Sequence, residues 1–283
     1  MQTLTQIKAI LESRGLSPKR SLGQNFLTDH NLIRKLVDAA GLAPDELVLE
    51  VGPGTGTMTE ELLARGCTVV ACELDDALAA HLADHFAPEA AKGRFTLVHG
   101  DCLAGKHAVN PLILEAIAGR PFKLVANLPY GAGTPLMSVL LVDYPACSTF
   151  AVTIQREVAD RLLAAPGTKD YGALAVVAQA AAEVSRVATA PPECFWPRPD
   201  VVSAMVLMRR RDEPLADLPN LSDFCRVVFA QRRKQLGALL PKTTNWAAVA
   251  ASPGCEGITS TLRAEQLTPQ RIIALMHALP RPG

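Results

Sequence analysis

Short apolar segments alternate with helical patterns through most of the chain, and this alternation constrains the fold more than any other feature. The apolar segments occupy residues 47–51, 68–72, 95–98, 122–126 and 150–154. Helical patterns lie around residues 58–64, 77–86, 135–142 and 157–163. Strands that alternate with helices are typical of a parallel sheet with helices on both faces. The sequence therefore predicts an α/β fold with a Rossmann-like sheet.

The two ends of the chain depart from this alternation. Apolar spacing from Leu4 to Leu11 predicts a short amphipathic helix, and a second helix is expected to begin at Asp29. Residues 173–184 are expected to form a helix, or a helix that runs into a strand, and residues 201–208 form a late strand.

After residue 212 only helical patterns follow. One covers residues 224–240, and another begins at Thr268, whose side chain can cap a helix with Pro269 at its first position. We expect one domain over residues 1–211, with 1–28 as an N-terminal extension, and a small helical domain over residues 212–283.

Hydrophobic residues make up 49% of the chain and charged residues 20%, so a sizeable core can be buried. No apolar stretch is long enough to span a bilayer, and the first residues lack the pattern of a secretion signal. We therefore expect a soluble cytoplasmic protein with no membrane partner, and we expect it to be a monomer. The seven cysteines include no CxxC pair, which predicts free, mostly buried thiols.

His81 and His85 are four residues apart on a predicted helix, so both could face one metal ion. A zinc site needs further ligands, and no third or fourth candidate is close in sequence. We interpret the pair as part of a solvated helix face and expect no metal.

The net charge is zero, but the charges are unevenly distributed. Residues 1–35 contain six Lys or Arg against two acids, and residues 190–283 contain twelve against eight. Basic ends that flank an acidic middle are compatible with a polyanionic partner, although ordinary surface charge explains the asymmetry equally well.

The predicted strand at residues 47–51 runs into Gly52-Pro53-Gly54-Thr55-Gly56 and then into a helix. Glycines at such a turn let a ligand approach the backbone near a helix N-terminus. Polar residues follow the next three strands as well, namely Glu73, Asp101 and Asn127. Because ligands bind at the carboxyl ends of parallel strands, these residues predict a nucleoside-cofactor site, with Glu73 accepting from ribose hydroxyls and Asp101 from an adenine amine.

The segment Asn127-Leu128-Pro129-Tyr130 indicates the substrate. The exocyclic amine of adenine is a poor nucleophile, and two acceptors can hold its N–H groups so that its lone pair points at a methyl carbon. The Asn127 side chain and the Leu128 carbonyl can provide these acceptors, and Pro129 restricts Leu128 to an extended conformation. Tyr130 can stack on the extruded base.

With these residues, the sequence resembles the KsgA/RsmA family of small-subunit rRNA adenine dimethyltransferases over nearly the whole chain. The resemblance also covers residues 19–27, 155–159, 171–174, 195–204 and 229–234. It implies a class I methyltransferase sheet, S-adenosylmethionine as the cofactor, and N6,N6-dimethylation of two adjacent adenosines near the 3′ end of 16S rRNA within the small ribosomal subunit. The implied cofactor residues are Asn25, Leu27, Gly52, Gly54, Gly56, Glu73, Asp101 and Asn127.

The same resemblance implies that Phe195 helps to enclose the target base and that the helical domain binds RNA, for which Arg232, Arg233 and Lys234 are the candidates. The chain departs from the family at Gly131-Ala132-Gly133, where two glycines are expected to loosen the backbone beside the catalytic segment.

Two alternatives remain open. One is an Erm-type methyltransferase of 23S rRNA, and the other is a non-catalytic RNA-binding assembly factor with the same fold.

Overall fold

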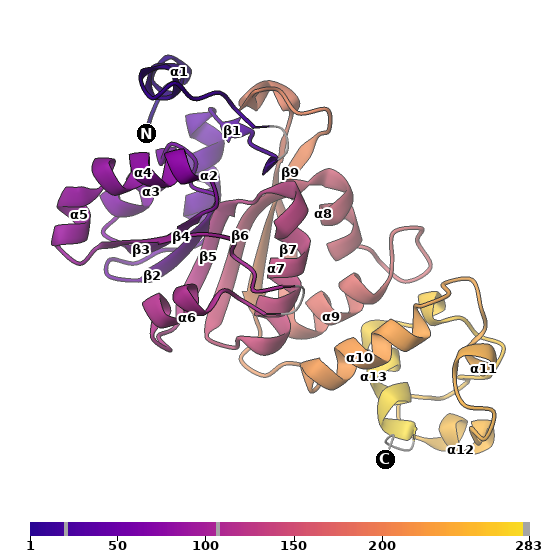
Figure 1. The fold of residues 1–283 in the computed structure, drawn as a ribbon. Coiled ribbons are helices and arrows are strands. Elements are labelled where there is room, and N and C mark those ends of the chain that lie inside the picture. Colours follow the sequence, from indigo (N-terminus) through magenta and orange to yellow (C-terminus); the bar gives the residue numbers. More distant parts are fainter. Residues whose placement is uncertain (20–21, 106–107, 280–283) are drawn as a thin grey trace. The chain divides into compact units, whose positions relative to one another are not determined.

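The computed structural model describes residues 1–19, 22–105 and 108–279. Among these residues, a seven-stranded sheet has helices on both of its sides (Figure 1). Across the sheet the strands are β4 (Phe95–His99), β3 (Thr68–Glu73), β2 (Leu47–Val51), β5 (Phe122–Asn127), β6 (Cys147–Gln155), β9 (Ser203–Arg210) and β7 (Ala182–Ala190). The first five are parallel to their neighbours, and β9 is antiparallel to β6.

The predicted alternation of strands and helices is confirmed. Between α1 and β7 in the chain, the helices are α2 (His30–Ala39), α3 (Thr57–Ala64), α4 (Asp76–His85), α5 (Ala87–Ala91), α6 (Pro111–Ile117), α7 (Tyr130–Asp143), α8 (Arg156–Leu162) and α9 (Ala173–Ala181). All five residues of β2 are buried, as expected for a parallel strand with helices on both faces. Helix α2 begins where predicted, because the Asp29 carboxylate accepts from the N–H groups of Asn31 and Leu32.

The order of the strands determines where a ligand can bind. Successive strands are added on one side from β2 to β4 and on the other side from β5 to β6. The order therefore reverses between β2 and β5, and ligands of open α/β sheets bind outside the carboxyl ends of the strands at such a reversal.

A two-stranded sheet and the N-terminal helix accompany the large sheet. Strand β1 (Phe26–Leu27) pairs antiparallel with β8 (Phe195–Trp196), which follows the short helix η2 (Pro192–Cys194). Helix α1 (Leu4–Ser13) is amphipathic as predicted, with Ile7 and Leu11 buried.

The chain divides into two compact units. Unit 1 comprises Met1–Leu140, Tyr144–Ala159 and Ser185–Arg209, and it contains most of the large sheet. Unit 2 comprises Leu141–Asp143, Asp160–Val184 and the chain from Arg210 onward. The predicted boundary after residue 211 is close to the start of the last segment, whereas the two earlier segments lie in the predicted first domain. As a boundary between functional domains, it stays a prediction.

Unit 2 is helical, and α9 lies at its centre. The other helices are α10 (Leu218–Val228), α11 (Leu236–Leu239), α12 (Trp246–Ala251), η3 (Ala264–Gln266) and α13 (Pro269–Ala278). Both α10 and α13 pack on α9. The buried Tyr171 hydroxyl donates to the Leu267 carbonyl at 2.8 Å and joins two segments of the unit that are far apart in sequence. Thr268 caps α13 as predicted.

Two predictions about helices were wrong. The helical pattern over residues 224–240 is interrupted, because α10 ends at Val228 and α11 begins only at Leu236. Residues 231–235 are all polar or charged, so a helix there would have no apolar face to bury.

His81 is also not on a solvated helix face. It is buried, its Nε2 donates to the Thr55 carbonyl at 3.3 Å, and its ring stacks on that of His85 with centroids 5.4 Å apart.

Within the described residues, no helix combines the length and the hydrophobicity that a membrane crossing needs.

Candidate active site

A cavity of about 270 Å³ opens at the carboxyl ends of β2, β3, β4 and β5, where the strand order reverses. Its walls come from the glycine turn after β2, from the residues that follow β3, β4 and β5, and from residues 22–27. The predicted site residues that line it are Asn25, Leu27, Gly52, Gly54, Glu73, Asp101, Asn127, Leu128, Pro129 and Tyr130.

Two glycines of the turn are required by close contacts. Gly52 and Gly54 have φ angles of +71° and +62°, which favour glycine. A Cβ atom on Gly54 would lie 2.8 Å from the Phe26 ring, and one on Gly52 would lie 3.0 Å from Cγ of Pro129. The turn therefore packs directly against both the N-terminal segment and the segment from Asn127 to Tyr130.

Gly56, a predicted cofactor residue, is not among the residues that line the cavity. It has a φ of +92°, and a Cβ atom there would lie 2.6 Å from the Phe86 ring. The structure thus explains this glycine by the packing of α4 residues and Phe86 against the start of α3.

Glu73 occupies the end of β3 and is only 6% exposed. Its Oε2 accepts from the Gly54 N–H at 3.1 Å, and its Oε1 accepts from the Asp75 N–H at 3.0 Å. Burial raises the pKa of this carboxyl, and the two backbone bonds oppose that shift. Each carboxylate oxygen still has a lone pair for a hydroxyl donor, as the ribose prediction requires.

Glu50 lines the same cavity from β2 and is also buried. Thr59 Oγ1 donates to its Oε2 at 2.6 Å. Burial, helped by the nearby Glu73 charge, raises the pKa of Glu50 to about 8 despite this bond. The protonated form of Glu50 therefore predominates at neutral pH.

Asp101, by contrast, is exposed after β4, where its Oδ1 accepts from the Leu103 N–H at 2.9 Å. Its backbone carbonyl accepts from Asn110 Nδ2 at 2.6 Å, which holds the loop in place. The cavity thus has a buried carboxylate at β3 and a solvated one at β4.

Asn127 ends β5, and its side chain is bonded to a segment far away in sequence. Its Nδ2 donates to the Asn25 carbonyl at 2.9 Å. A carbonyl can only accept, so this bond fixes which side of the amide faces Asn25 and leaves Oδ1 as the acceptor. That orientation is the one that binding of an amine requires.

Leu128 and Pro129 continue from Asn127 into α7. The Leu128 N–H donates to the Thr153 carbonyl of β6 at 3.1 Å, and Pro129 has φ −57° and ψ 132°. Gly133 lies in the first turn of α7, and a Cβ atom there would lie 3.1 Å from Cβ of Leu128. Gly131 is in the same turn with open space around it. The backbone that the two glycines were expected to loosen therefore forms the first helical turn of α7.

Tyr130 is half-buried at the start of α7. Its hydroxyl lies 2.9 Å from Oγ of Ser203, which is fully buried on β9. Burial raises the pKa of Tyr130, so the phenol stays neutral. In the sequence, Ser203 stands out only as part of the matching segment 195–204, and no pattern there predicts its contact with Tyr130.

Phe195 and the basic cluster lie outside the cavity. Phe195 pairs with Leu27 across β1 and β8, and it is 5% exposed in an apolar cluster that also contains Leu27. In unit 2, Arg232 Nε donates to Glu265 Oε2 at 2.7 Å, and its guanidinium also bonds to the Thr168 and Lys169 carbonyls.

Arg233 and Lys234 are exposed. The three residues predicted to contact RNA therefore differ, because the Arg232 side chain is bonded to residues of unit 2, whereas the side chains of Arg233 and Lys234 are exposed.

The cavity fits a nucleoside cofactor. It combines a glycine turn that a ligand can approach closely, a carboxylate at the second strand end, and the apolar side chains of Leu74 and Leu78. The buried Glu73 carboxyl favours a positively charged group, because a nearby cation stabilises its ionised form. S-Adenosylmethionine has a ribose, an adenine and a sulfonium centre, and so matches each of these features.

Comparisons with known proteins agree with this geometry. The model of the family described as ribosomal RNA adenine dimethylase matches residues 15–279. The chain is 39% identical to ribosomal RNA small subunit methyltransferase A of Streptomyces griseus, over 97% of this chain and 94% of that protein. It is 43% identical to the protein of the same name from Geobacillus kaustophilus, over 81% and 78% of the two chains.

Two solved structures share the fold. A dimethyladenosine transferase from Plasmodium falciparum superposes with a TM-score of 0.70 at 21% identity, covering 88% of this chain and 95% of that one. The 23S rRNA methyltransferase ErmE superposes with a TM-score of 0.68 at 28% identity, covering 90% and 99%.

Proposed function

The chain belongs to the ribosomal RNA adenine dimethylase family, and from that premise we propose that it dimethylates N6 of two adjacent adenosines near the 3′ end of 16S rRNA. The methyl donor is S-adenosylmethionine. The observation that supports this function most directly is the anchored amide of Asn127, a residue that lines the cavity and whose Oδ1 is left as an acceptor.

Bound S-adenosylmethionine supplies a methyl group on positively charged sulfur, which makes the carbon electrophilic. We propose that Gly52 and Gly54 admit it to the backbone and that Glu73 accepts from its ribose hydroxyls. Asp101 binds its adenine amine, and Asn25 and Leu27 cover it from the N-terminal side. Gly56 supports the turn by admitting Phe86.

The catalytic segment positions the target amine. The Asn127 side-chain oxygen and the Leu128 carbonyl accept its two N–H groups, which directs the nitrogen lone pair at the methyl carbon. Tyr130 stacks on the base, and Pro129 keeps Leu128 extended. The nitrogen becomes acidic as it is alkylated, so most of the rate enhancement comes from positioning. Phe195 stays a predicted contact of the target base. Its pairing with Leu27, which lines the cavity, connects it to the site.

The direct test uses small ribosomal subunits from cells that lack the methylation. Incubation with the protein and labelled S-adenosylmethionine is expected to yield dimethyladenosine in a mass-spectrometric digest, at two neighbouring positions near the 3′ end of 16S rRNA. A digest without dimethyladenosine would reject the proposal. Modification of 23S rRNA instead would favour the Erm-type alternative, which the resemblance to ErmE supports.

We propose that residues 212–283 form the RNA-binding domain and that Arg233 and Lys234 contact phosphates. Replacing both with alanine is expected to weaken binding to under-methylated small subunits and to lower the salt dependence by about two counterions. The melting temperature should not change, because both side chains are exposed. Arg232→Ala is the matched comparison and should lower the melting temperature, because it removes the bond to Glu265. Unchanged affinity and salt dependence in the double variant would contradict this assignment.

We also propose that the protein acts as a monomer in the cytoplasm. Light scattering during size-exclusion chromatography checks the first point, and fractionation checks the second.

A further inference from the structure

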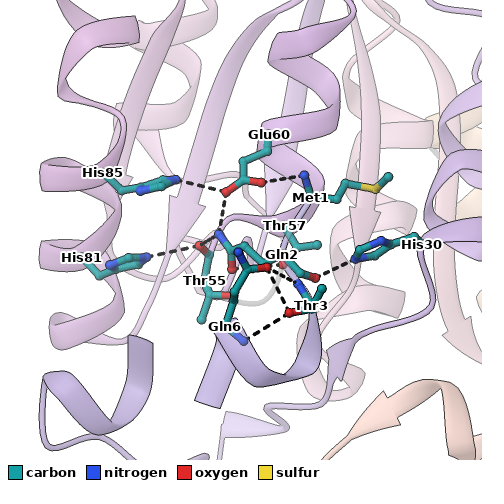
Figure 2. A network of polar contacts seen from close by, with 10 residues as sticks. All are labelled: Met1, Gln2, Thr3, Gln6, His30, Thr55, Thr57, Glu60, His81 and His85. Atoms are coloured by element: carbon teal, nitrogen blue, oxygen red, sulfur yellow. Dashed lines mark hydrogen bonds and ion pairs between the residues drawn. The ribbon is translucent and has the colours of Figure 1, made fainter. Parts of the chain in front are cut away.

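Gln2 is buried beside the glycine turn, and its side-chain amide is bonded at both ends (Figure 2). Its Nε2 donates to the Thr55 carbonyl at 2.8 Å and to Glu60 Oε1 at 2.8 Å. Its Oε1 accepts from Thr57 Oγ1 at 3.2 Å. Gln2 is 5% exposed, and a buried amide is stable only when bonded, so these contacts determine its position.

The three partners of Gln2 belong to the glycine turn and to the first turn of α3. Thr55 and Thr57 line the cofactor cavity, whereas Gln2 does not. Gly54 and Gly56 flank Thr55 with φ angles of +62° and +92°. Glycines restrict the backbone little. Within the turn the Thr55–Gly56 peptide is held by the bond from the Gly56 N–H to the Pro53 carbonyl at 2.9 Å, and contacts to the Thr55 carbonyl from outside the turn add to this support.

Two side chains contact the Thr55 carbonyl, and the contact from the Gln2 amide is the shorter one. His81 Nε2 reaches the same oxygen at 3.3 Å, against 2.8 Å for Gln2. The Gln2 backbone is fixed as well, because His30 Nε2 donates to its carbonyl at 2.7 Å (Figure 2). Gln2 is thus held from α2 and in turn holds the glycine turn.

We propose that Gln2 is a positioning residue for cofactor binding. By holding the Thr55 carbonyl, its amide orients the turn between Gly54 and Thr57 so that the backbone faces the cofactor. The N-terminal segment thereby completes the cofactor site without touching the cofactor through this side chain.

This role is separable from the docking of α1. Ile7 and Leu11 are buried in an apolar cluster with Phe26 and Leu78, and these contacts do not involve Gln2. Replacing the Gln2 amide therefore removes bonds to the turn and leaves the apolar contacts of the helix in place.

The test is calorimetric binding of S-adenosylhomocysteine to two single variants, Gln2→Leu and Gln2→Glu. Leucine has no amide, and glutamate keeps the shape but cannot donate to Thr55 and places a second carboxylate beside Glu60. Both are expected to weaken binding by about tenfold, the effect of losing roughly one net hydrogen bond to a buried carbonyl. In methyl transfer, the KM for S-adenosylmethionine should rise by the same factor, and kcat should stay within about twofold.

Gln6→Leu is the matched control, because Gln6 is exposed and its side chain caps the same helix by accepting from Thr3 (Figure 2). It should bind S-adenosylhomocysteine like the unchanged protein. Unchanged binding in both Gln2 variants would overturn the proposal. So would an equal loss in Gln6→Leu, because docking of α1 would then be responsible. The binding measurement needs no RNA, so it can fail while the proposed RNA methylation stands.

Discussion

The two halves of the cavity are held in place by different kinds of contacts. On the cofactor side, the Gly52 N–H donates to the Cys72 carbonyl at 2.9 Å and the Gly54 N–H to Glu73 at 3.1 Å, so the turn is bonded to the neighbouring strand β3. On the target side, the Asn127 side chain is bonded to Asn25, which is 102 positions away in sequence. The Tyr130 hydroxyl is bonded to Ser203, which is 73 positions away. The cofactor half is therefore bonded mainly to the adjacent strand β3, with Gln2 as an additional support, and the target half depends on side-chain bonds to distant segments.

The largest expected effect comes from Asn127→Ala, which removes the anchored acceptor on the target side. We expect kcat to fall by roughly 10²–10³, as for the loss of one preorganised hydrogen-bonding group in other enzymes. Calorimetry should show that S-adenosylhomocysteine affinity is largely kept. An equal collapse of cofactor affinity would mean that the two halves are not held independently.

A second prediction concerns the pH dependence of stability. The cofactor half, which contains Glu50, is expected to contribute more to this dependence than the target half. Burial raises the pKa of Glu50 to about 8, so between about pH 4.5 and 8 the folded protein keeps a proton that the unfolded chain loses. The free energy of unfolding should therefore decrease with rising pH in this window, by at most about 1.4 kcal/mol per pH unit from this group.

Glu50→Gln removes the titration and preserves the shape of the side chain. Urea unfolding at several pH values should show a flatter profile for this variant between pH 5 and 8. Parallel profiles for the two proteins would contradict the assignment.

Gly54→Ala tests the close packing of the cofactor half. The new Cβ atom would lie 2.8 Å from the Phe26 ring, so either the turn or the N-terminal segment must move. We expect affinity for S-adenosylhomocysteine to fall by about tenfold or more, with a stability loss of about 1–2 kcal/mol from the positive φ.

Gly119→Ala is the control, because Gly119 has a φ of +69° and open space around it. It should lose similar stability and keep its affinity for the cofactor. If both variants bind equally well, close packing at Gly54 does not matter for the site.

The smallest expected effect is that of Ser203→Ala, which frees the Tyr130 hydroxyl. We expect kcat to fall by about fivefold, in line with one neutral hydrogen bond, while cofactor affinity stays unchanged. Tyr130→Phe removes the same bond, so the loss in the double variant should be less than the sum of the two single losses.

Thr153→Val provides the control on β6. Among the described residues, Thr153 has a buried hydroxyl without a hydrogen-bond partner, so its removal should leave kcat within about twofold. An equal loss in this variant would indicate general damage to the sheet.

The two halves of the cavity also differ in how much of them the sequence could predict. The glycine turn, Glu73, Asp101 and Asn127 follow successive strands, and parallel strands bring their carboxyl ends together by topology alone. The supports of the target half could not be predicted, because Asn25 reaches Asn127 through a backbone carbonyl that any residue has. Gln2 and Ser203 are common residue types, and only their burial and partners distinguish them.

The burial of His81 could not be predicted either, because its contact with the Thr55 carbonyl lies across the fold. Gly56 continues the glycine motif in sequence, but the ring that a Cβ atom there would meet, Phe86, is thirty residues further along the chain. The role of Gly56 in cofactor binding stays a prediction.

Unit 2 is built from separate segments of the chain. This affects how the unit forms during synthesis and how the chain can be divided into fragments. Helix α9 is made before α10 and α13, so the surface of α9 on which these two helices pack stays uncovered by them until the C-terminal helices have left the ribosome. A fragment beginning at residue 212 would lack α9 and expose the faces that pack on it. A chimera that exchanges the helical unit between relatives should therefore transfer residues 160–184 together with the C-terminal segment.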